Sequence, residues 1–387
     1  MNPIKVALVS CGLGHINRGF EISTARWYRA LSREPGLDVR LYAGGEHADA
    51  TRITTIHRDK WLNGPLRYLP FVDGKLRWEI AYVLEQITFG IGLLPYRSGW
   101  VPDVVWTKEV PLAHFLYYIR AMLNLRYKIV FANGAPFNPK TYRQFDFIQQ
   151  LQQESYDDAL RAGIPASKMS IIPNCVPVVL PIASRQELRR AYGYSDDDWI
   201  VICVAAWNSY HKRLDYLIEE VAALNDPSVK LFLCGDRETE TTALEQLAAQ
   251  RLGNRVQWRT LAEQEVRNAM HMADVFVLPS LREGLGAVLI EAAMAGLPVL
   301  SHPHAGSKYI LENSEWMADL SQRGALTEWL RQLKADPPAE SSLKELQTRV
   351  TNRFNDRFLA TRFREMVEKI TASQFDQSAV LETRLSS

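Results

Sequence analysis

The second half of the chain alternates short apolar runs with helical patterns, and this alternation constrains the fold more than any other feature. The apolar runs, which predict strands, lie at 199–206, 230–234, 255–258, 275–279 and 299–302. The helical patterns between them lie at 214–224, 242–251, 263–272 and 286–295. Strands that alternate with helices form βαβ units and a parallel sheet. The second half is therefore predicted to be a doubly wound α/β domain.

The first half repeats this pattern less regularly. A buried strand is expected at 5–10, a helix at 21–33, and further strands at 39–43, 104–107 and 128–132. The whole chain has 387 residues, too many for one hydrophobic core and enough for two α/β domains. We expect the two domains to face each other across a cleft, with ligands at the carboxyl ends of their strands.

A proline-rich segment separates the two halves. Residues 171–181 (IIPNCVPVVLP) contain three prolines, and proline is unfavourable both in helices and in inner strands. The predicted domains are 1–180 and 181–350. They are followed by a C-terminal helix at 351–372, which could pack back on the first domain, and a flexible tail at 373–387.

Composition excludes several classes of protein. The formal net charge of +1 gives no indication of nucleic-acid binding. The four cysteines contain no C-x-x-C pair, which favours reduced thiols in a cytoplasmic protein. The apolar run after Lys5 is too short for a signal peptide, and no apolar stretch approaches the ~18 residues that span a membrane. We expect a soluble protein.

The segment 275–298 carries the clearest functional signal. A buried strand runs into the turn Glu283-Gly-Leu-Gly286 and then into a helix that begins near Ala287. Glycines let the backbone approach a ligand closely, and the unpaired N–H groups of a helix start favour anions such as a diphosphate. A carboxylate on the turn, Glu283, can accept hydrogen bonds from sugar hydroxyls.

Glu291 lies about one and a half turns inside this helix, in an almost wholly apolar sequence. A buried charge needs a partner, and ribose hydroxyls would supply one. A capped or salt-bridged helix carboxylate is the structural alternative.

The segment from Pro279 to Val299 resembles P-S-x-x-E-G-x-G-x-x-x-x-E-A-x-A-x-G-x-P-V, the donor signature of glycosyltransferase family 4, with Met294 in place of the second alanine of E-A-x-A. Further landmarks follow the family order at 171–174, 211–218 and 231–235, although Cys175 replaces the usual glycine. The resemblance covers roughly residues 1–310 and is weak over 45–100. It implies two Rossmann-like domains in the GT-B fold and a retaining hexosyltransferase.

The resemblance also implies a set of donor contacts. Glu283 would bind sugar hydroxyls, the amides of Gly284, Leu285, Gly286 and Ala287 would bind the sugar and phosphates, and Glu291 would hold the ribose. Lys212 would neutralise the diphosphate, and backbone at 259–261, including Leu261, would contact the base. The donor would be a nucleotide-diphosphate sugar. The acceptor would be a glycan, a lipid-linked molecule or a small molecule.

One position departs from the family pattern. The family usually has an arginine five residues before this lysine, where the present sequence has Trp207. Either Arg213 supplies the second positive charge, or the indole shapes the pocket and Lys212 works alone. We expect Arg213 to supply it.

The turn after the first strand, Gly12-Leu-Gly14-His15, lacks the G-x-G-x-x-G spacing of dinucleotide-binding proteins. In the family this turn approaches the donor phosphates and the acceptor, and 19–21 resembles its "G-G-x-E". Gly14 and His15 are therefore predicted contacts. Gly14-His15 also resembles the turn of inverting plant-type glycosyltransferases, in which the histidine is a general base. That alternative stays open.

In the retaining family the accepted picture is front-face transfer, in which the leaving diphosphate helps to deprotonate the acceptor. The protein's task is then electrostatic stabilisation, and Lys212, Glu283 and His15 are the residues we associate with catalysis. Asn133 stands where the family often has a histidine and is a candidate sugar contact, or an ordinary turn residue. The D-x-D at 196–198 precedes a strand, so we expect no metal and no other cofactor.

Residues 52–77 mix cations with aromatic side chains, namely Trp61, Tyr68 and Phe71, with Trp78 following directly. This mixture is typical of peripheral contact with an anionic membrane, here the inner face, or of a lipid-diphosphate acceptor. It is also compatible with an ordinary solvated loop.

Two other classes remain. A nucleotide-sugar 2-epimerase would share the fold but would need acid–base carboxylates and a histidine in the cleft. A non-catalytic sugar-binding protein would not need Glu283, Glu291 and Lys212 together.

Overall fold

The structure is a computed structural model, and it describes residues 2–16, 18–68, 73–94, 99–135, 137–312 and 314–372. The chain divides into two compact units. Unit 1 comprises Met1–Cys175 and Asp356–Ser387, and unit 2 comprises Val176–Asn355. The predicted tail at 373–387 and Phe71 lie outside the described residues.

Unit 1 is built on a parallel sheet whose strand order is β3-β2-β1-β4-β5-β6-β7. The strands are β1 Ile4–Ser10, β2 Leu37–Ala43, β3 Thr51–Arg52, β4 Val104–Thr107, β5 Lys128–Asn133, β6 Phe147–Gln150 and β7 Met169–Ile171. The helices are α1 Gly19–Leu31, α2 Arg58–Asn63, α3 Gly74–Leu93, α4 Val110–Met122, α5 Gln153–Arg161 and α14 Asp356–Ala372.

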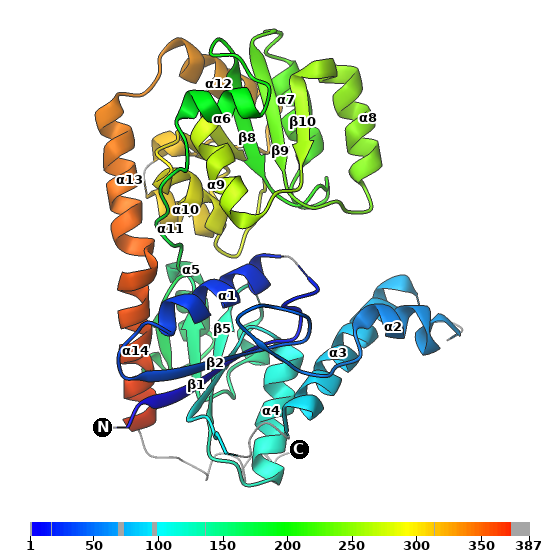
Figure 1. The fold of residues 1–387 in the computed structure, drawn as a ribbon, viewed down its shortest axis with the longest axis vertical. Helices are drawn as coiled ribbons and strands as arrows, with labels where there is room; N and C mark the ends of the chain where they lie inside the picture. Colours follow the sequence, from blue (N-terminus) through cyan, green and yellow to red (C-terminus); the bar gives the residue numbers. More distant parts are fainter. Residues whose placement is uncertain are drawn as a thin grey trace. The chain divides into compact units, whose positions relative to one another are not determined.

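Helices lie on both faces of this sheet (Figure 1), and each face is covered by a layer of buried apolar side chains. On one face, Trp27 of α1 and Phe363 of α14 pack over Trp106 of β4. On the other face, Phe89 of α3 and Leu112 of α4 pack over Phe131 of β5. Helices on both faces explain why these strands are continuous apolar runs, because a sheet buried on both sides has no polar face.

Unit 2 contains a five-stranded parallel sheet of order β10-β9-β8-β11-β12. Its strands are β8 Trp199–Val204, β9 Val229–Cys234, β10 Val256–Arg259, β11 Val275–Leu278 and β12 Val299–Ser301. Its helices are α6 Arg185–Ala191, α7 Leu214–Ala222, α8 Thr241–Leu252, α9 Glu263–Met272, α10 Ala287–Met294, α11 Ala305–Leu311, α12 Ala325–Ala335 and α13 Glu340–Phe354. The predicted class, two doubly wound parallel sheets with helices, is confirmed.

The element bounds differ from the sequence expectations in three places. The chain divides after Cys175 and not at 180. The helix expected at 351–372 is two helices, because Asn355 is extended and ends α13. Helix α3 was not predicted, although it has 20 residues, because it is apolar on more than one face and so lacks a clear amphipathic period.

Candidate functional site

Each sheet reverses its strand order at one point, and ligands of doubly wound folds bind beyond the carboxyl ends of the strands there. In unit 2 this switch point lies between β8 and β11, and in unit 1 it lies between β1 and β4. Lys212 follows β8 and Glu283 follows β11, whereas Gly14 and His15 follow β1. The topology therefore brings these four residues to the switch point of their own unit.

Lys212 and Glu283 form an ion pair that joins the two loops at the switch point of unit 2. The Nζ atom of Lys212 lies 2.5 Å from Oε1 of Glu283. Burial alone would raise the pKa of Glu283, but the Lys212 ammonium and the nearby His211 bring it below its ordinary value. The carboxylate therefore stays ionised and can accept hydrogen bonds.

A buried asparagine that the sequence analysis missed holds the Lys212 loop. Asn208 Oδ1 accepts hydrogen bonds from the backbone N–H groups of His211 and Lys212 at 3.1 and 2.8 Å. Its Nδ2 donates to Glu238 at 2.9 Å. Its signal in the sequence is only a turn-type asparagine after a strand, which is common in loops of no function.

The Glu283 turn ends in a left-handed residue and packs tightly on a second helix. Gly286 has φ of +79° and precedes the first residue of α10, Ala287, so the unpaired N–H groups of that helix start at the turn. The Leu285 carbonyl approaches Gly306 of α11 so closely that a Cβ there would lie 2.2 Å from the oxygen. Gly284 is half-buried on this turn.

Glu291 lies further along α10 and is half-buried. It lines a small cavity together with Met294, with Met270 and His271 of α9, and with the segment 176–179. Leu261, after β10, donates its backbone N–H to the Cys234 thiol, whose pKa burial raises to about 12. The ribose and base roles of these two residues stay predictions.

The two alternatives to the missing arginine have distinct surroundings. Trp207 is buried in the core of unit 2 and its ring meets Trp258 edge to face, with centroids 5.0 Å apart. The Arg213 guanidinium donates to the carbonyls of Leu320 at 2.6 Å and Pro279 at 3.3 Å. These contacts tie one guanidinium nitrogen of Arg213 to protein backbone, and its contact with the diphosphate stays a prediction.

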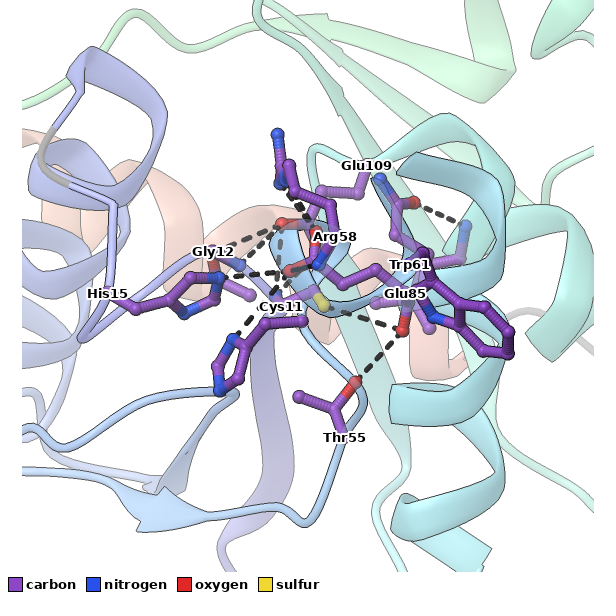
Figure 2. Close-up of polar contacts among 12 residues, drawn as sticks. Cys11, Gly12, His15, Thr55, Arg58, Trp61, Glu85 and Glu109 are labelled. Atoms are coloured by element: carbon purple, nitrogen blue, oxygen red, sulfur yellow. Dashed lines mark hydrogen bonds and ion pairs between the residues drawn. The ribbon is translucent and has the colours of Figure 1, made fainter. Parts of the chain in front are cut away.

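In unit 1, a buried carboxylate organises the turn after β1 (Figure 2). Glu109, which directly precedes α4, accepts hydrogen bonds from the N–H groups of Cys11 at 2.9 Å and Gly12 at 3.3 Å. Burial raises the pKa of Glu109 to about 7. Gly14 has φ of +90°, and a Cβ on it would lie 2.5 Å from the backbone of Gly45. Only glycine suits that position.

A second buried carboxylate, Glu85 of α3, lies close to three cationic or titratable side chains (Figure 2). Its Oε1 lies 3.1 Å from Nε2 of His15 and 3.7 Å from Nδ1 of His57. Its Oε2 accepts from the Arg58 guanidinium at 2.7 Å. Burial alone would raise the pKa of Glu85, but the His15 hydrogen bond and the Arg58 charge bring it below its usual range.

The sequence analysis did not anticipate Glu85, Glu109 or the adjacent Lys108. Lys108 is buried, donates to Asn174 at 2.8 Å, and has its pKa lowered by burial to about 7. A charged pair that directly follows an apolar strand, Lys108-Glu109, was the available signal. Glu85 had none, because helix α3 itself was not predicted.

His15, His57 and Glu85 are the one group of potential metal ligands found in the described part of the chain. Arg58 pairs with Oε2 of this carboxylate, so its positive charge would repel a cation held by Oε1 and the two histidines. The D-x-D at 196–198 is used differently, since Asp198 accepts from the Ser195 N–H at 2.7 Å and lies 3.4 Å from the Lys230 ammonium.

Asn133 ends β5 and is buried, with Nδ2 donating to Gln150 at 2.8 Å. Within 52–77, Arg58 points inward to Glu85, and the Trp61 ring nitrogen donates to the Ile56 carbonyl at 3.1 Å. Some of the cationic and aromatic side chains predicted to face a membrane therefore make contacts within unit 1 instead. None of the described helices has both the length and the apolar character needed to cross a membrane.

Comparison with known proteins agrees with this geometry. Residues 184–350 match the family described as glycosyl transferases group 1. The putative glycosyltransferase EpsD of Bacillus subtilis is 28% identical over 359 residues, covering 88% of this chain and 90% of that protein. The alpha-galactosylglucosyldiacylglycerol synthase of Streptococcus pneumoniae is 24% identical, covering 60% of this chain and 63% of the relative.

Two solved structures share the fold. Sucrose-phosphate synthase from Thermosynechococcus elongatus has a TM-score of 0.77 at 19% identity, covering 96% of this chain and 100% of that one. HepE from Anabaena, in complex with UDP-glucose, has a TM-score of 0.73 at 15% identity, covering 94% and 99%. The fold and the matches together support a glycosyltransferase of the GT-B type. The family match and the relatives support a glycosyltransferase family 4-type protein.

Proposed function

We propose that this protein is a metal-independent, retaining hexosyltransferase that takes a sugar from a nucleotide diphosphate. The observation that carries the proposal is the 2.5 Å pair between Lys212 and Glu283 at the switch point of unit 2. The pair lies at the turn that leads into α10, which begins at Ala287, and this position supports a role for Lys212 at the diphosphate and for Glu283 at the sugar. A leaving diphosphate and its sugar need these two groups next to each other.

In this mechanism the bond between the anomeric carbon and the diphosphate oxygen breaks first. The acceptor oxygen then bonds to the same face of the oxocarbenium-like sugar, and the leaving diphosphate takes the acceptor's proton. Lys212 and the N–H groups that begin α10 stabilise the charge that develops on the diphosphate. No side-chain nucleophile is required.

Lys212 acts without Arg213 in this proposal. The Arg213 guanidinium is held by two backbone carbonyls and lies 4.2 Å from the Tyr216 ring centroid. We therefore assign Arg213 a positioning role at the start of α7. With a single lysine at the diphosphate, its removal should affect catalysis more than in an enzyme with two cations.

The remaining donor contacts follow from the resemblance. Glu283, with the backbone of Gly284, Leu285, Gly286 and Ala287, binds the sugar and phosphates, Glu291 holds the ribose, and backbone near Leu261 contacts the base. Unit 1 supplies the acceptor side through Gly14 and His15, with Asn133 as a sugar contact. The acceptor is a glycan, a lipid-linked molecule or a small molecule.

The test is turnover with UDP-, GDP- and ADP-sugars and a panel of acceptors, in the presence of EDTA. We expect nucleotide release with one donor class, undiminished by the chelator, and a product whose anomeric configuration matches the donor by NMR. Loss of activity in EDTA that Mg²⁺ or Mn²⁺ restores would rule out metal independence. A 2-epimeric nucleotide sugar would indicate an epimerase, and no reaction with any donor would indicate a binding protein.

One observation favours a second candidate, an inverting transferase. His15 and the buried Glu85 lie 3.1 Å apart, a pairing that would hold a histidine in the orientation of a general base. In that case the NMR product would have the opposite anomeric configuration, and His15→Asn would lower kcat by at least ~10²-fold. In the retaining mechanism, His15→Asn should chiefly raise the KM for the acceptor.

We further propose a cytoplasmic location with peripheral contact of unit 1 at the inner face of the membrane. The name of the Streptococcus relative, a diacylglycerol-glycoside synthase, supports a lipid-linked acceptor as one member of the test panel.

A further inference from the structure

Helix α3 presents an aliphatic stripe to solvent. Leu76, Val83 and Ile91 have exposed fractions of 45%, 38% and 53%, and Ile80 and Ile87 between them are half-buried. Their spacing of three or four residues places all five on one face of the helix. The opposite face buries Ala81, Glu85 and Phe89 in unit 1. A solvent-facing helix normally shows the reverse distribution.

Helix α4 carries a second exposed apolar group. Tyr118 and Met122 are 62% and 70% exposed, and Leu123 is 41% exposed. The two helices touch at Gly90 of α3, where a Cβ would lie 2.4 Å from the Phe115 ring of α4. This contact is one residue from Ile91 and one helical turn from Tyr118. We therefore treat the aliphatic stripe of α3 and the exposed apolar group of α4 as one surface, called the α3–α4 surface.

Aromatic and basic side chains border the N-terminal end of α3. Trp78 is 42% exposed and stacks on Tyr82 with ring centroids 5.3 Å apart, and Lys60, Arg67 and Lys75 are exposed. Figure 1 shows α3 extending beyond the sheet of unit 1 with α2 packed against its outer part. Interfacial aromatic rings and lysine or arginine beside an apolar helix face are typical of membrane-surface binding.

Charge identifies the kind of partner. Residues 1–175 contain six more lysines and arginines than acidic residues, although the whole chain has a formal net charge of only +1. A second copy of unit 1 would bring the same excess of positive charge to the interface. An anionic lipid surface would complement it, and would accept apolar side chains to the depth of the headgroup boundary.

We propose that the α3–α4 surface, and not the basic segment 52–77 alone, docks the protein on an anionic membrane. This proposal rests on the peripheral contact proposed above and names its surface and lipid chemistry. The aliphatic stripe enters the headgroup region, and the flanking cations pair with lipid phosphates. The contact is independent of which sugar is transferred.

The experiment is vesicle co-sedimentation of the full chain with phosphatidylcholine alone and with phosphatidylcholine containing about one third phosphatidylglycerol, at low and high salt. The variant is Val83→Glu/Ile91→Glu. The matched control is Val178→Glu/Ile182→Glu, which introduces the same charges at aliphatic side chains of unit 2 that are 54% and 73% exposed. Thermal unfolding of each variant reports whether it is folded.

We expect the wild type and the control to bind the anionic vesicles in a salt-sensitive way, and the α3 variant to have a partition coefficient more than about tenfold lower. If the wild type does not bind at low salt, the peripheral contact itself is wrong. If the wild type and the folded α3 variant bind equally, or if the control loses as much binding, the contact exists but the α3–α4 surface is wrong. A concentration-dependent dimer that the α3 variant abolishes, without vesicle binding, would assign the surface to a second copy.

Discussion

At the scale of single residues, Lys212 and Glu283 depend on each other. Each is largely buried and each is the other's closest charged partner, with side-chain exposures of 19% and 10%. Removing one leaves an unpaired charge, which is costly when buried. A substitution at either position therefore affects both the local structure and the chemistry, and its test needs a measure of each.

Lys212→Met keeps most of the side-chain volume and removes the charge. We expect kcat to fall by ~10²–10³-fold, as for loss of one stabilising group at a developing anion, while the KM for the donor changes less. Steady-state kinetics with the active donor measures both. Lys334→Met is the control, because Lys334 pairs with Asp226 and Ser228 away from the switch point. An equal loss of kcat in the control would contradict the role of Lys212.

His304 should make stability depend on pH. Its Nδ1 accepts the Ser307 N–H at 3.1 Å and caps α11, and burial lowers its pKa to about 4. The unfolded pKa is about 6.5, so the unfolded chain takes up the proton first as pH falls. Stability from the neutral imidazole is complete above pH ~6.5 and is lost towards pH 4, by up to ~3 kcal/mol.

Asparagine is a good helix cap that does not titrate in this range. The urea midpoint of His304→Asn, relative to that of the wild type, should therefore be higher at pH 5 than at pH 7.5. The two midpoints are measured by tryptophan fluorescence. A difference that stays constant between the two pH values would show that His304 does not titrate as described.

The sequence predicted residues best where a motif fixes them in one local segment. Glu283 and Gly286 belong to a strand–turn–helix unit, and the structure has that unit at the expected place. Arg213 was less predictable, because its direction depends on carbonyls of Pro279 and Leu320, 66 and 107 residues away. Glu85 was unpredictable for the same reason, since it meets His15 only through the packing of α3.

At the scale of elements, the packing of α11 against the Glu283 turn gives a prediction. A methyl group on Gly306 would lie 2.2 Å from the Leu285 carbonyl oxygen, so Gly306→Ala must displace the turn or the helix. We expect a loss of ~1–3 kcal/mol in stability and a several-fold higher KM for the donor. Denaturant unfolding and steady-state kinetics measure these two effects.

Gly74→Ala is the matched control, because Gly74 also lies in the first turn of a helix and its Cβ would meet nothing within 4 Å. It should leave the KM for the donor unchanged and stability equal or slightly higher. If Gly306→Ala behaves like this control, the close approach of α11 does not position the donor turn.

Helices and strands were predictable where their apolar residues follow a single periodicity. The strands of unit 2 are short apolar runs and lie within a few residues of their expected bounds. Helix α3 combines an exposed aliphatic face with a buried face that contains Glu85 and Gln86, which inverts the usual pattern. The division of 351–372 into two helices depends on the extended backbone of Asn355. No local sequence motif indicates this conformation.

At the scale of the whole molecule, the two units are built from the chain in different ways. Unit 2 is one continuous segment, whereas unit 1 needs residues from both ends of the chain. Helix α14 closes the core of unit 1 with the buried side chains of Leu359, Phe363, Met366, Val367 and Ile370. Lys128 of β5 also donates to the Ile370 carbonyl at 2.7 Å.

A chain that ends at Asn355 should therefore lose unit 1 and keep unit 2. Burial of each of those apolar side chains contributes about 1.5–3 kcal/mol, so five of them together match the ~5–15 kcal/mol that stabilises a typical domain. We expect proteolysis of the truncated chain to degrade unit 1 and leave a fragment near 176–355. That fragment, expressed alone, should show cooperative unfolding and bind the nucleotide sugar, because Lys212, Glu283 and Glu291 all lie within it. If residues 1–175 of the truncated chain resist proteolysis as well as they do in the wild type, α14 is not needed to complete unit 1.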